Sequence, residues 1–168
     1  SIKNAEPYVV TERGVLITFE GTSIHSPLLG KFNIYNILAA ATFARTQGID
    51  TAIIKRAVEK IATIAGRGEK IEEGQAFTAI VDYAHTPDSL EALYSAFPDK
   101  RKICVLGNTG GGRDAWKRPE MASIADTYCS VSILTDEDPY DEDPMSIINA
   151  MKTGFTEHTP DVIINRRE

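Results

Sequence analysis

The sequence has 168 residues, of which 42% are hydrophobic and 25% charged, and a formal net charge of −6. This composition is ordinary for a globular chain that buries a core, and the length fits one domain or a small fragment joined to one domain. The negative charge argues against non-specific binding to nucleic acid or anionic lipid. Because no apolar run approaches a membrane span and the N-terminus lacks a signal-peptide pattern, we expect a soluble, cytoplasmic protein.

The N-terminal third predicts a β-hairpin followed by two helices. Residues 8–20 are rich in β-branched and aromatic side chains and are interrupted at Arg13-Gly14, and a second extended stretch runs over residues 23–29. Apolar side chains then recur at helical spacing from Asn33 until Gly48, and Asp50 has the position of the N-cap of a second helix. The expected buried positions are Ile34, Ile37, Leu38 and Ala41 in the first helix and Ile53, Ile54, Ala57, Val58 and Ile61 in the second.

A glycine-rich break at residues 66–68 suggests a domain boundary, which gives domains at 1–65 and 66–168. Beyond it, apolar strands at 77–83, 102–107, 131–134 and 162–164 alternate with helices. The helices begin at Thr86-Pro87, at Pro119 (ending near Tyr128) and at Asp143-Pro144. This order predicts an α/β fold with a Rossmann-like parallel sheet covered on both faces, preceded by a partial αβ segment. Ligands of such sheets bind at the carboxyl ends of the strands, where three polar clusters fall here.

The first cluster is a glycine-rich loop over residues 107–114. Gly110, Gly111 and Gly112 allow backbone amides to approach an anion closely, and Arg113 adds positive charge. The loop is not a Walker A sequence, because no Lys-Ser/Thr follows the last glycine, and its spacing does not fit a dinucleotide-binding motif. An anion-binding loop and a flexible connection are equally consistent with this sequence.

The second cluster, residues 82–88, joins a strand to a helix. Asp82 could accept a hydrogen bond from a hydroxyl group or coordinate a metal, with His85 beside it. Alternatively, Asp82 and Asp88 serve the helix N-terminus, and chemistry alone slightly favours this interpretation. His25 and His158 lack convergent partners in the sequence and are expected at the solvated surface.

The third cluster places six carboxylates in the eight residues 136–143. They form either a solvated acidic loop or, at the end of a strand, a site for an ammonium group; the spacing does not fit an EF-hand. Cys104 and Cys129 lack metal-binding spacing and lie in apolar stretches, so we expect two buried thiols in a reducing compartment.

Taken in order, these segments resemble the Mur ligases, specifically the UDP-N-acetylmuramoyl-tripeptide synthetases that add the third amino acid of the peptidoglycan stem. Residues 29–40 resemble the family's G-[RK]-F-N-x-Y-N-x-x-A-A segment, and residues 82–88 match D-Y-A-H-T-P-D in full. Residues 110–119 match G-G-x-R-D…K-R-P, and later residues match E-D-P and R-R-E. The resemblance covers nearly all of residues 29–168.

The resemblance implies a reaction in which ATP phosphorylates a peptide carboxylate and an incoming amine attacks the acyl phosphate. It implies ATP and Mg²⁺ as cofactors, with most Mg²⁺ ligands outside this chain, and UDP-MurNAc-dipeptide and a diamino acid as substrates of a monomeric enzyme. The residues expected to face ATP are Asn33, Asn36, Arg67, Asp82 and His85. The amino-acid site would comprise Arg118, gripping the carboxylate, with Glu137, Asp138, Pro139 and Tyr140. No residue is assigned to catalysis or to a metal.

The sequence departs from the family pattern in two ways. Diaminopimelate-adding members carry D-N-P-R where this chain has residues 137–140, so Tyr140 replaces an arginine and Asp138 adds a negative charge. This difference predicts L-lysine or another diamine in preference to diaminopimelate. The P-loop and the UDP-sugar-binding domain are also absent, which predicts a truncated chain without ligase activity of its own. A folylpolyglutamate-type ligase and a non-catalytic nucleotide- or amino-acid-binding module are the alternatives.

Overall fold

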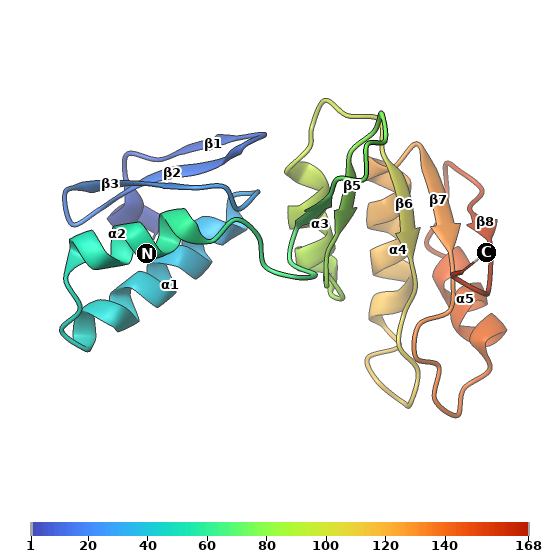
Figure 1. The fold of residues 1–168 in the computed structure, drawn as a ribbon. Coiled ribbons are helices and arrows are strands. Elements are labelled where there is room, and N and C mark those ends of the chain that lie inside the picture. The colour runs from blue at the N-terminus through green and yellow to red at the C-terminus, as the bar shows by residue number, and fades with distance from the viewer. Residues whose placement is uncertain (1, 168) are drawn as a thin grey trace. The chain divides into compact units, whose positions relative to one another are not determined.

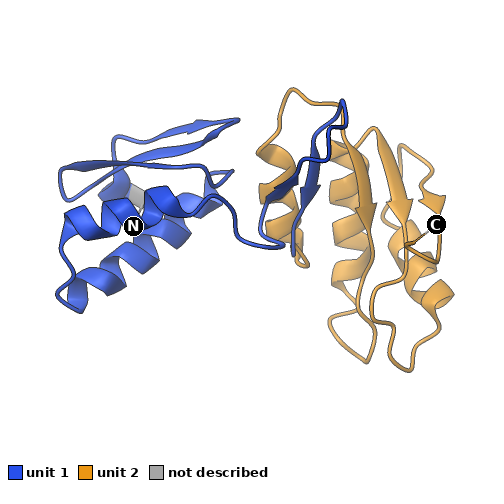
Figure 2. Ribbon diagram, in the orientation of Figure 1, with its two compact units in different colours: residues 1–83 blue, residues 84–168 orange. Residues whose placement is uncertain are grey.

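The computed structural model describes residues 2–167. The chain divides into two compact units, residues 1–83 and residues 84–168 (Figure 2). Each unit has its own hydrophobic core. In the described part of the chain, no helix has the length and apolar character needed to cross a bilayer.

The first unit packs two helices against a small antiparallel sheet (Figure 1). The strands are β1 (Val9–Thr11), β2 (Gly14–Phe19) and β3 (Thr22–Ser26), in the order β1-β2-β3. A 3₁₀ turn, η1 (Ile2–Ala5), precedes them, and α1 (Phe32–Thr46) and α2 (Thr51–Lys60) follow. The predicted hairpin and both helices are confirmed. The N-cap role of Asp50 is also confirmed, because its side chain accepts a hydrogen bond from the Ala52 N–H at 2.7 Å.

The predicted buried face of α2 is only partly correct. Ile54 and Val58 are buried, whereas Ile53 is 49% exposed and Ile61 is 41% exposed. Ile53 precedes Ile54 by one residue and therefore points about 100° away from it around the helix axis. Ile61 is the C-cap, whose backbone is extended, so helical spacing no longer sets the direction of its side chain.

A short antiparallel hairpin completes the first unit. β4 (Glu69–Ile71) pairs with β5 (Ala79–Val81), with Glu69 opposite Val81. The sequence predicts a longer strand over residues 77–83 within the parallel sheet. That prediction is wrong in its pairing, because β4 is the hydrogen-bonded neighbour of β5. The sequence does not predict strand β4, because it is short and two of its residues are charged types that are uncommon in strands.

The second unit contains the predicted parallel sheet, in the order β6-β7-β8. Its strands are β6 (Ile103–Leu106), β7 (Val131–Leu134) and β8 (Asp161–Val162), and its helices are α3 (Pro87–Ser95), α4 (Lys117–Tyr128) and α5 (Pro144–Lys152). Figure 1 shows the three helices along one face of this sheet. Cys104 and Leu106 face that core, while Ile103 and Val105 are more than 60% exposed. The α/β class is thus confirmed, but helices cover one face of the sheet in residues 84–167 rather than the two expected.

The helix starts in this unit follow local capping rules. Thr86 and Ser89 form a reciprocal capping box at the start of α3, and the Asp143 carboxylate accepts from the backbone N–H groups of Met145 and Ser146. The helix α4 begins at Lys117, two residues before the predicted start at Pro119. Proline is tolerated there because the first-turn N–H groups have no intrahelical partner.

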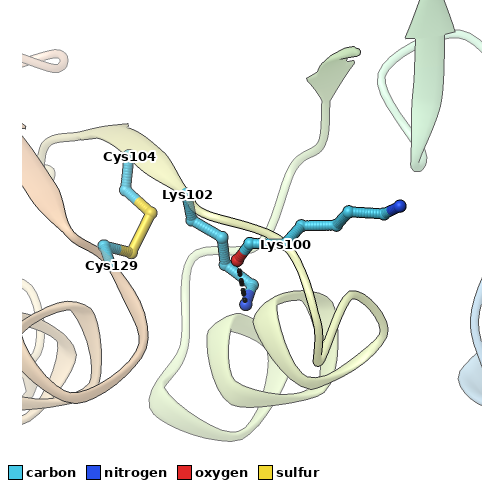
Figure 3. Close-up of a disulfide and its surroundings, with 4 residues drawn as sticks. All are labelled: Lys100, Lys102, Cys104 and Cys129. Carbon is cyan, nitrogen blue, oxygen red and sulfur yellow. Dashed lines mark hydrogen bonds between the residues drawn. A yellow bond between two sulfur atoms is a disulfide. The ribbon is translucent and has the colours of Figure 1, made fainter. Parts of the chain in front are cut away.

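The two cysteines are buried as predicted, but the expectation of free thiols is wrong. Cys104 on β6 and Cys129 at the end of α4 form a disulfide (Figure 3). The end of α4 returns beside β6, where the Ser130 N–H donates to the Lys102 carbonyl oxygen at 2.9 Å. Sequence spacing could not reveal this pairing, because 25 residues separate the two cysteines and only the tertiary fold brings them together.

Reducing this disulfide is expected to destabilise the second unit. The disulfide joins residues that are 25 positions apart. Reducing it raises the conformational entropy of the unfolded chain and lowers the free energy of unfolding by about 3 kcal/mol. Urea unfolding followed by fluorescence of Trp116, the single tryptophan, should show an earlier midpoint in dithiothreitol. A Cys104→Ala/Cys129→Ala variant is the control and should not respond to the reductant. An unchanged wild-type midpoint would contradict the prediction.

Candidate functional site

Two polar loops meet at the carboxyl end of the parallel sheet. The glycine-rich loop (residues 107–114) follows β6, and the acidic loop (residues 136–143) follows β7. The Gly110 N–H donates to the Asp138 carbonyl oxygen at 3.1 Å, and the Asp136 N–H donates to the Ile164 carbonyl oxygen at 3.1 Å. The structure therefore brings together two of the predicted clusters and the segment after β8.

The glycine-rich loop packs too closely on the acidic loop to carry side chains. A Cβ atom at Gly110 would lie 2.1 Å from the Pro139 carbonyl oxygen, far inside contact distance. Gly111 and Gly112 have φ values of +71° and +70°, which L-residues with side chains rarely adopt. Because the Gly112 N–H donates to Glu142 Oε1 at 3.1 Å, the loop amide points at a carboxylate of the same chain.

Arg118, in the first turn of α4, is buried beneath these loops. It is 5% exposed, and its Nη2 donates to Glu142 Oε2 at 2.9 Å and to the Thr109 carbonyl oxygen at 3.3 Å. Within residues 2–167 its buried Nε has no hydrogen-bond partner. A buried guanidinium normally pairs all of its N–H donors, so the Nε of Arg118 is a donor that the described residues leave unsatisfied.

Glu142 joins the glycine-rich loop to Arg118. Hydrogen bonds from the Gly112 N–H and from the Arg118 side chain lower the pKa of Glu142 below its ordinary value, against a smaller effect of burial. The carboxylate therefore remains ionised at neutral pH. One oxygen accepts from Gly112 and the other from Arg118, so this side chain bridges two elements that are distant in sequence.

Residues 137–140, predicted for the amino-acid site, lie directly against the glycine-rich loop. Asp138 and Tyr140 have φ values of +37° and +54°, a left-handed conformation that is uncommon for residues other than glycine. A Cβ atom at Gly107 would approach the Glu137 side chain, and one at Gly111 would approach the Tyr140 ring. The Arg113 guanidinium lies 6.0 Å from the centre of that ring. The loop thus presents an exposed tyrosine and an exposed aspartate at the edge of the sheet.

Sequence reasoning missed two participants in this region, Glu142 and Arg166. Arg166 donates through Nη2 to the Asp136 carbonyl oxygen, and its Nε lies 3.8 Å from Asp136 Oδ1. Both residues stand in segments that match the family's E-D-P and R-R-E sequences. That match was the available signal, although Glu168, the last residue of the second segment, lies outside the described residues.

The residues predicted to face ATP fall partly in the first unit, at the start of α1. Asn33 is 2% exposed, and its Nδ2 donates to the Leu29 carbonyl oxygen at 2.6 Å. The exposed Asn36 donates through Nδ2 to Asn33 Oδ1 at 3.0 Å. Asn33 therefore fixes the turn before the helix and orients Asn36, which is the more accessible side chain.

Asp82 is engaged with the glycine turn that precedes β4. Its Oδ2 accepts from the Gly68 N–H at 2.6 Å, and the exposed Arg67 guanidinium lies 4.8 Å from the Tyr83 ring centre. The interpretation that Asp82 and Asp88 serve the helix N-terminus is confirmed for Asp88, which lies in the first turn of α3. The observed contact of Asp82 is with Gly68, and Thr86 is the residue that caps the helix. His85, the last of the predicted ATP-facing residues, is exposed.

One of the histidine predictions is only partly correct, because His158 is exposed as expected but is not without a partner. His25 is exposed, as expected, but His158 has a partner: its Nδ1 lies 2.9 Å from Oδ1 of the buried Asp126. Burial alone would raise the pKa of Asp126, but the backbone N–H groups of residues 156–158 and the His158 ring outweigh it and lower the pKa to about 2. The ionised Asp126 at the end of α4 thereby holds the segment between α5 and β8.

Residues 2–167 contain no group of three or more His, Cys, Asp or Glu side chains placed to hold a metal ion. Two carboxylates of the acidic loop are instead directed to the protein itself: Asp143 caps α5, and Glu142 pairs with Arg118. The residues that the structure describes therefore do not fit a Mg²⁺ site, and no chemical step is assigned to a metal here.

Comparison with known proteins agrees with the resemblance seen in the sequence. Residues 66–168 match the family described as "Mur ligase, glutamate ligase domain". This chain belongs to the Mur ligase family.

Among the relatives of this Mur ligase chain is a UDP-N-acetylmuramoyl-L-alanyl-D-glutamate–2,6-diaminopimelate ligase of Bacillus cereus, 38% identical over 171 residues. The alignment covers 98% of this chain and 35% of the relative. A solved structure of a ligase with the same name is 30% identical, covers 97% of this chain and 35% of that one, and has a TM-score of 0.58. The chain thus spans about a third of the relatives that it matches.

A likeness to more distant enzymes shows the fold alone. Mycobacterium tuberculosis folylpolyglutamate synthase, solved with ADP, is 19% identical and has a TM-score of 0.76. That alignment covers 97% of this chain and 38% of the other. The α/β architecture of this chain is therefore shared with a protein of low sequence identity, and the likeness carries no information about substrate.

Proposed function

We propose that the protein containing this chain is an ATP-dependent ligase that adds a diamino acid to UDP-MurNAc-L-Ala-D-Glu. The observation that carries the proposal is the buried Arg118, held at the carboxyl end of a parallel sheet where the glycine-rich and acidic loops meet. The planar guanidinium suits bidentate recognition of a carboxylate. The names of the relatives, which are ligases of this dipeptide, support the same reaction.

The reaction has two steps. A carboxylate oxygen of the dipeptide attacks the γ-phosphorus of ATP, forms an acyl phosphate and releases ADP. The neutral α-amine of the incoming amino acid then attacks the acyl carbon, phosphate leaves, and the amide nitrogen loses a proton. Arg118 holds the carboxylate of the amino acid, so that its amine is presented to the acyl phosphate in a fixed orientation.

On the nucleotide side, the accessible groups are Arg67, Asp82, Asn36 and His85. An exposed guanidinium stacked on the Tyr83 ring suits contact with phosphate oxygens, and the second oxygen of Asp82 suits a hydroxyl donor. Asn33 acts through Asn36, because its own side-chain groups bond to Leu29 and Asn36. These are the proposed roles of four of the five predicted residues; the fifth, His85, is assigned to ATP by the family match alone.

The preferred amino acid is lysine rather than diaminopimelate. Where diaminopimelate-adding members carry an arginine, this chain carries the exposed Tyr140, with the exposed Asp138 two residues before it. A carboxylate at this edge disfavours the second carboxylate of diaminopimelate and favours the side-chain ammonium of lysine. The relatives are named for diaminopimelate, so the preference for lysine rests on the departure of residues 137–140 from the family's D-N-P-R sequence.

Substituting Tyr140→Arg in the full-length protein is expected to reverse the preference. The ratio of kcat/KM for diaminopimelate to that for lysine should rise by about 100-fold, because the new guanidinium pairs with the second carboxylate. Tyr140→Phe is the matched control and should retain the preference for lysine. If the unmodified enzyme prefers diaminopimelate, the lysine assignment is wrong, and Arg113, near the Tyr140 ring, becomes the candidate partner of that carboxylate.

The ligase activity itself is tested by phosphate release from ATP. Release should require both UDP-MurNAc-L-Ala-D-Glu and a diamino acid, and mass spectrometry should show the tripeptide product. Ligation of glutamate to a folate would instead place the protein with the folylpolyglutamate synthases. Nucleotide binding without turnover on either substrate pair would indicate a non-catalytic binding module.

A further inference from the structure

The acidic loop contains one carboxylate whose contacts differ from those of its neighbours. Asp138 and Asp141 are exposed, and Asp143 caps the following helix. Glu142 alone among the described residues of this loop reaches both the glycine-rich loop and Arg118. Its side chain is 27% exposed, whereas that of Arg118 is 6% exposed, so the pair is largely shielded from water.

The geometry of this pair leaves part of the arginine available. Glu142 Oε2 accepts from Nη2 of Arg118 at 2.9 Å, and the same Nη2 donates to the Thr109 carbonyl oxygen at 3.3 Å. Both contacts lie on one terminal nitrogen, Nη2. They orient the guanidinium plane but do not engage its other two nitrogens, Nη1 and Nε. The unpaired Nε is consistent with an incomplete set of partners.

The second contact of Glu142 sets the conformation of the glycine-rich loop. Its Oε1 accepts from the Gly112 N–H at 3.1 Å, at a position with a φ of +70°. A glycine in this region of φ,ψ space has many alternative conformations. One carboxylate therefore holds both the loop and the arginine, and an error in its position would displace them together.

We propose that Glu142 is a positioning residue of the amino-acid site, which orients Arg118 and the glycine-rich loop toward the carboxylate of the incoming amino acid. The inference rests on the proposed function. Glu142 acts through Arg118 and does not itself touch the substrate, since its two oxygens are engaged by Arg118 and Gly112. Its lowered pKa keeps it charged throughout the neutral range.

The test measures steady-state kinetics of full-length Glu142→Gln. The glutamine retains an acceptor for Gly112 but loses the charge that holds Arg118. The KM for the amino acid should therefore rise about tenfold, while the KM for ATP stays close to wild type. Glu142→Asp, which keeps the charge, should recover part of the affinity. Asp99→Asn removes one exposed charge from the same unit, outside both loops, and is the matched control, with an amino-acid KM like that of wild type.

The outcomes separate this inference from the proposed function. An active wild type whose Glu142→Gln variant keeps its amino-acid KM would overturn the positioning role and leave the ligase assignment intact. Equal losses for ATP and the amino acid, together with a lower melting temperature, would also overturn it, because they indicate a general structural role. A wild type that ligates no amino acid would overturn the proposed function, and the positioning role with it.

Discussion

Replacing Arg118 by lysine in the full-length enzyme is expected to reduce kcat/KM for the amino acid by about 100-fold. Lysine keeps the positive charge but cannot offer two parallel N–H donors, so the bidentate grip on a carboxylate is lost. It also leaves Glu142 and the Thr109 carbonyl oxygen competing for one flexible ammonium. Kinetics with varied amino acid at saturating ATP should show the loss mainly in KM for the amino acid.

Arg101→Lys provides the control for this substitution. Arg101 is an exposed arginine of the same unit, so the change is chemically identical but lies away from the loops. It should leave the kinetics unaltered. An Arg118→Lys enzyme that binds the amino acid as well as wild type would remove Arg118 from the amino-acid site.

Substituting Asp126→Asn is expected to destabilise the second unit by about 2 kcal/mol at pH 7. The wild-type carboxylate accepts from the N–H groups of Thr156, Glu157 and His158 and from the Thr156 hydroxyl. An amide loses the charge and turns an NH₂ group toward some of these donors. Chemical unfolding followed by Trp116 fluorescence reports the change, because this tryptophan lies in the same unit.

The stabilisation that the Asp126 carboxylate provides should decrease at acidic pH. The folded-state pKa is about 2, below the unfolded value near 3.9. The stabilisation is therefore complete above about pH 4 and is lost as the pH falls toward 2. The stability difference between wild type and Asp126→Asn should shrink across this window. Asp99→Asn, at an exposed position of the same unit, should show no such pH-dependent difference.

The features that sequence predicted correctly are governed by local interactions. Asp50, Thr86 and Asp143 each accept hydrogen bonds from amides two or three residues later, so a short window contains all the information needed. The parallel strands β6 and β7 were likewise predictable, because they are short apolar runs between helices. The fold class followed from this alternation.

The features that sequence missed depend on contacts between distant residues. The Cys104–Cys129 disulfide spans 25 residues, the Asp126–His158 pair spans 32, and the Arg118–Glu142 pair spans 24. None of these separations has a period or motif that identifies its partner. The roles of residues 137–140 came from family resemblance, whereas their packing on the glycines was visible only in three dimensions.

The close packing of Gly110 on Pro139 constrains how this protein can change during evolution. With the Pro139 carbonyl oxygen 2.1 Å from where a Cβ would lie, neither backbone can shift or gain a residue without a compensating change in the other. Insertions and deletions at this edge should therefore be rare or paired between the two loops. Under the proposed function, the choice of amino acid would then change through single substitutions at exposed positions such as 138 and 140, which alter the chemistry of the loop while preserving its backbone.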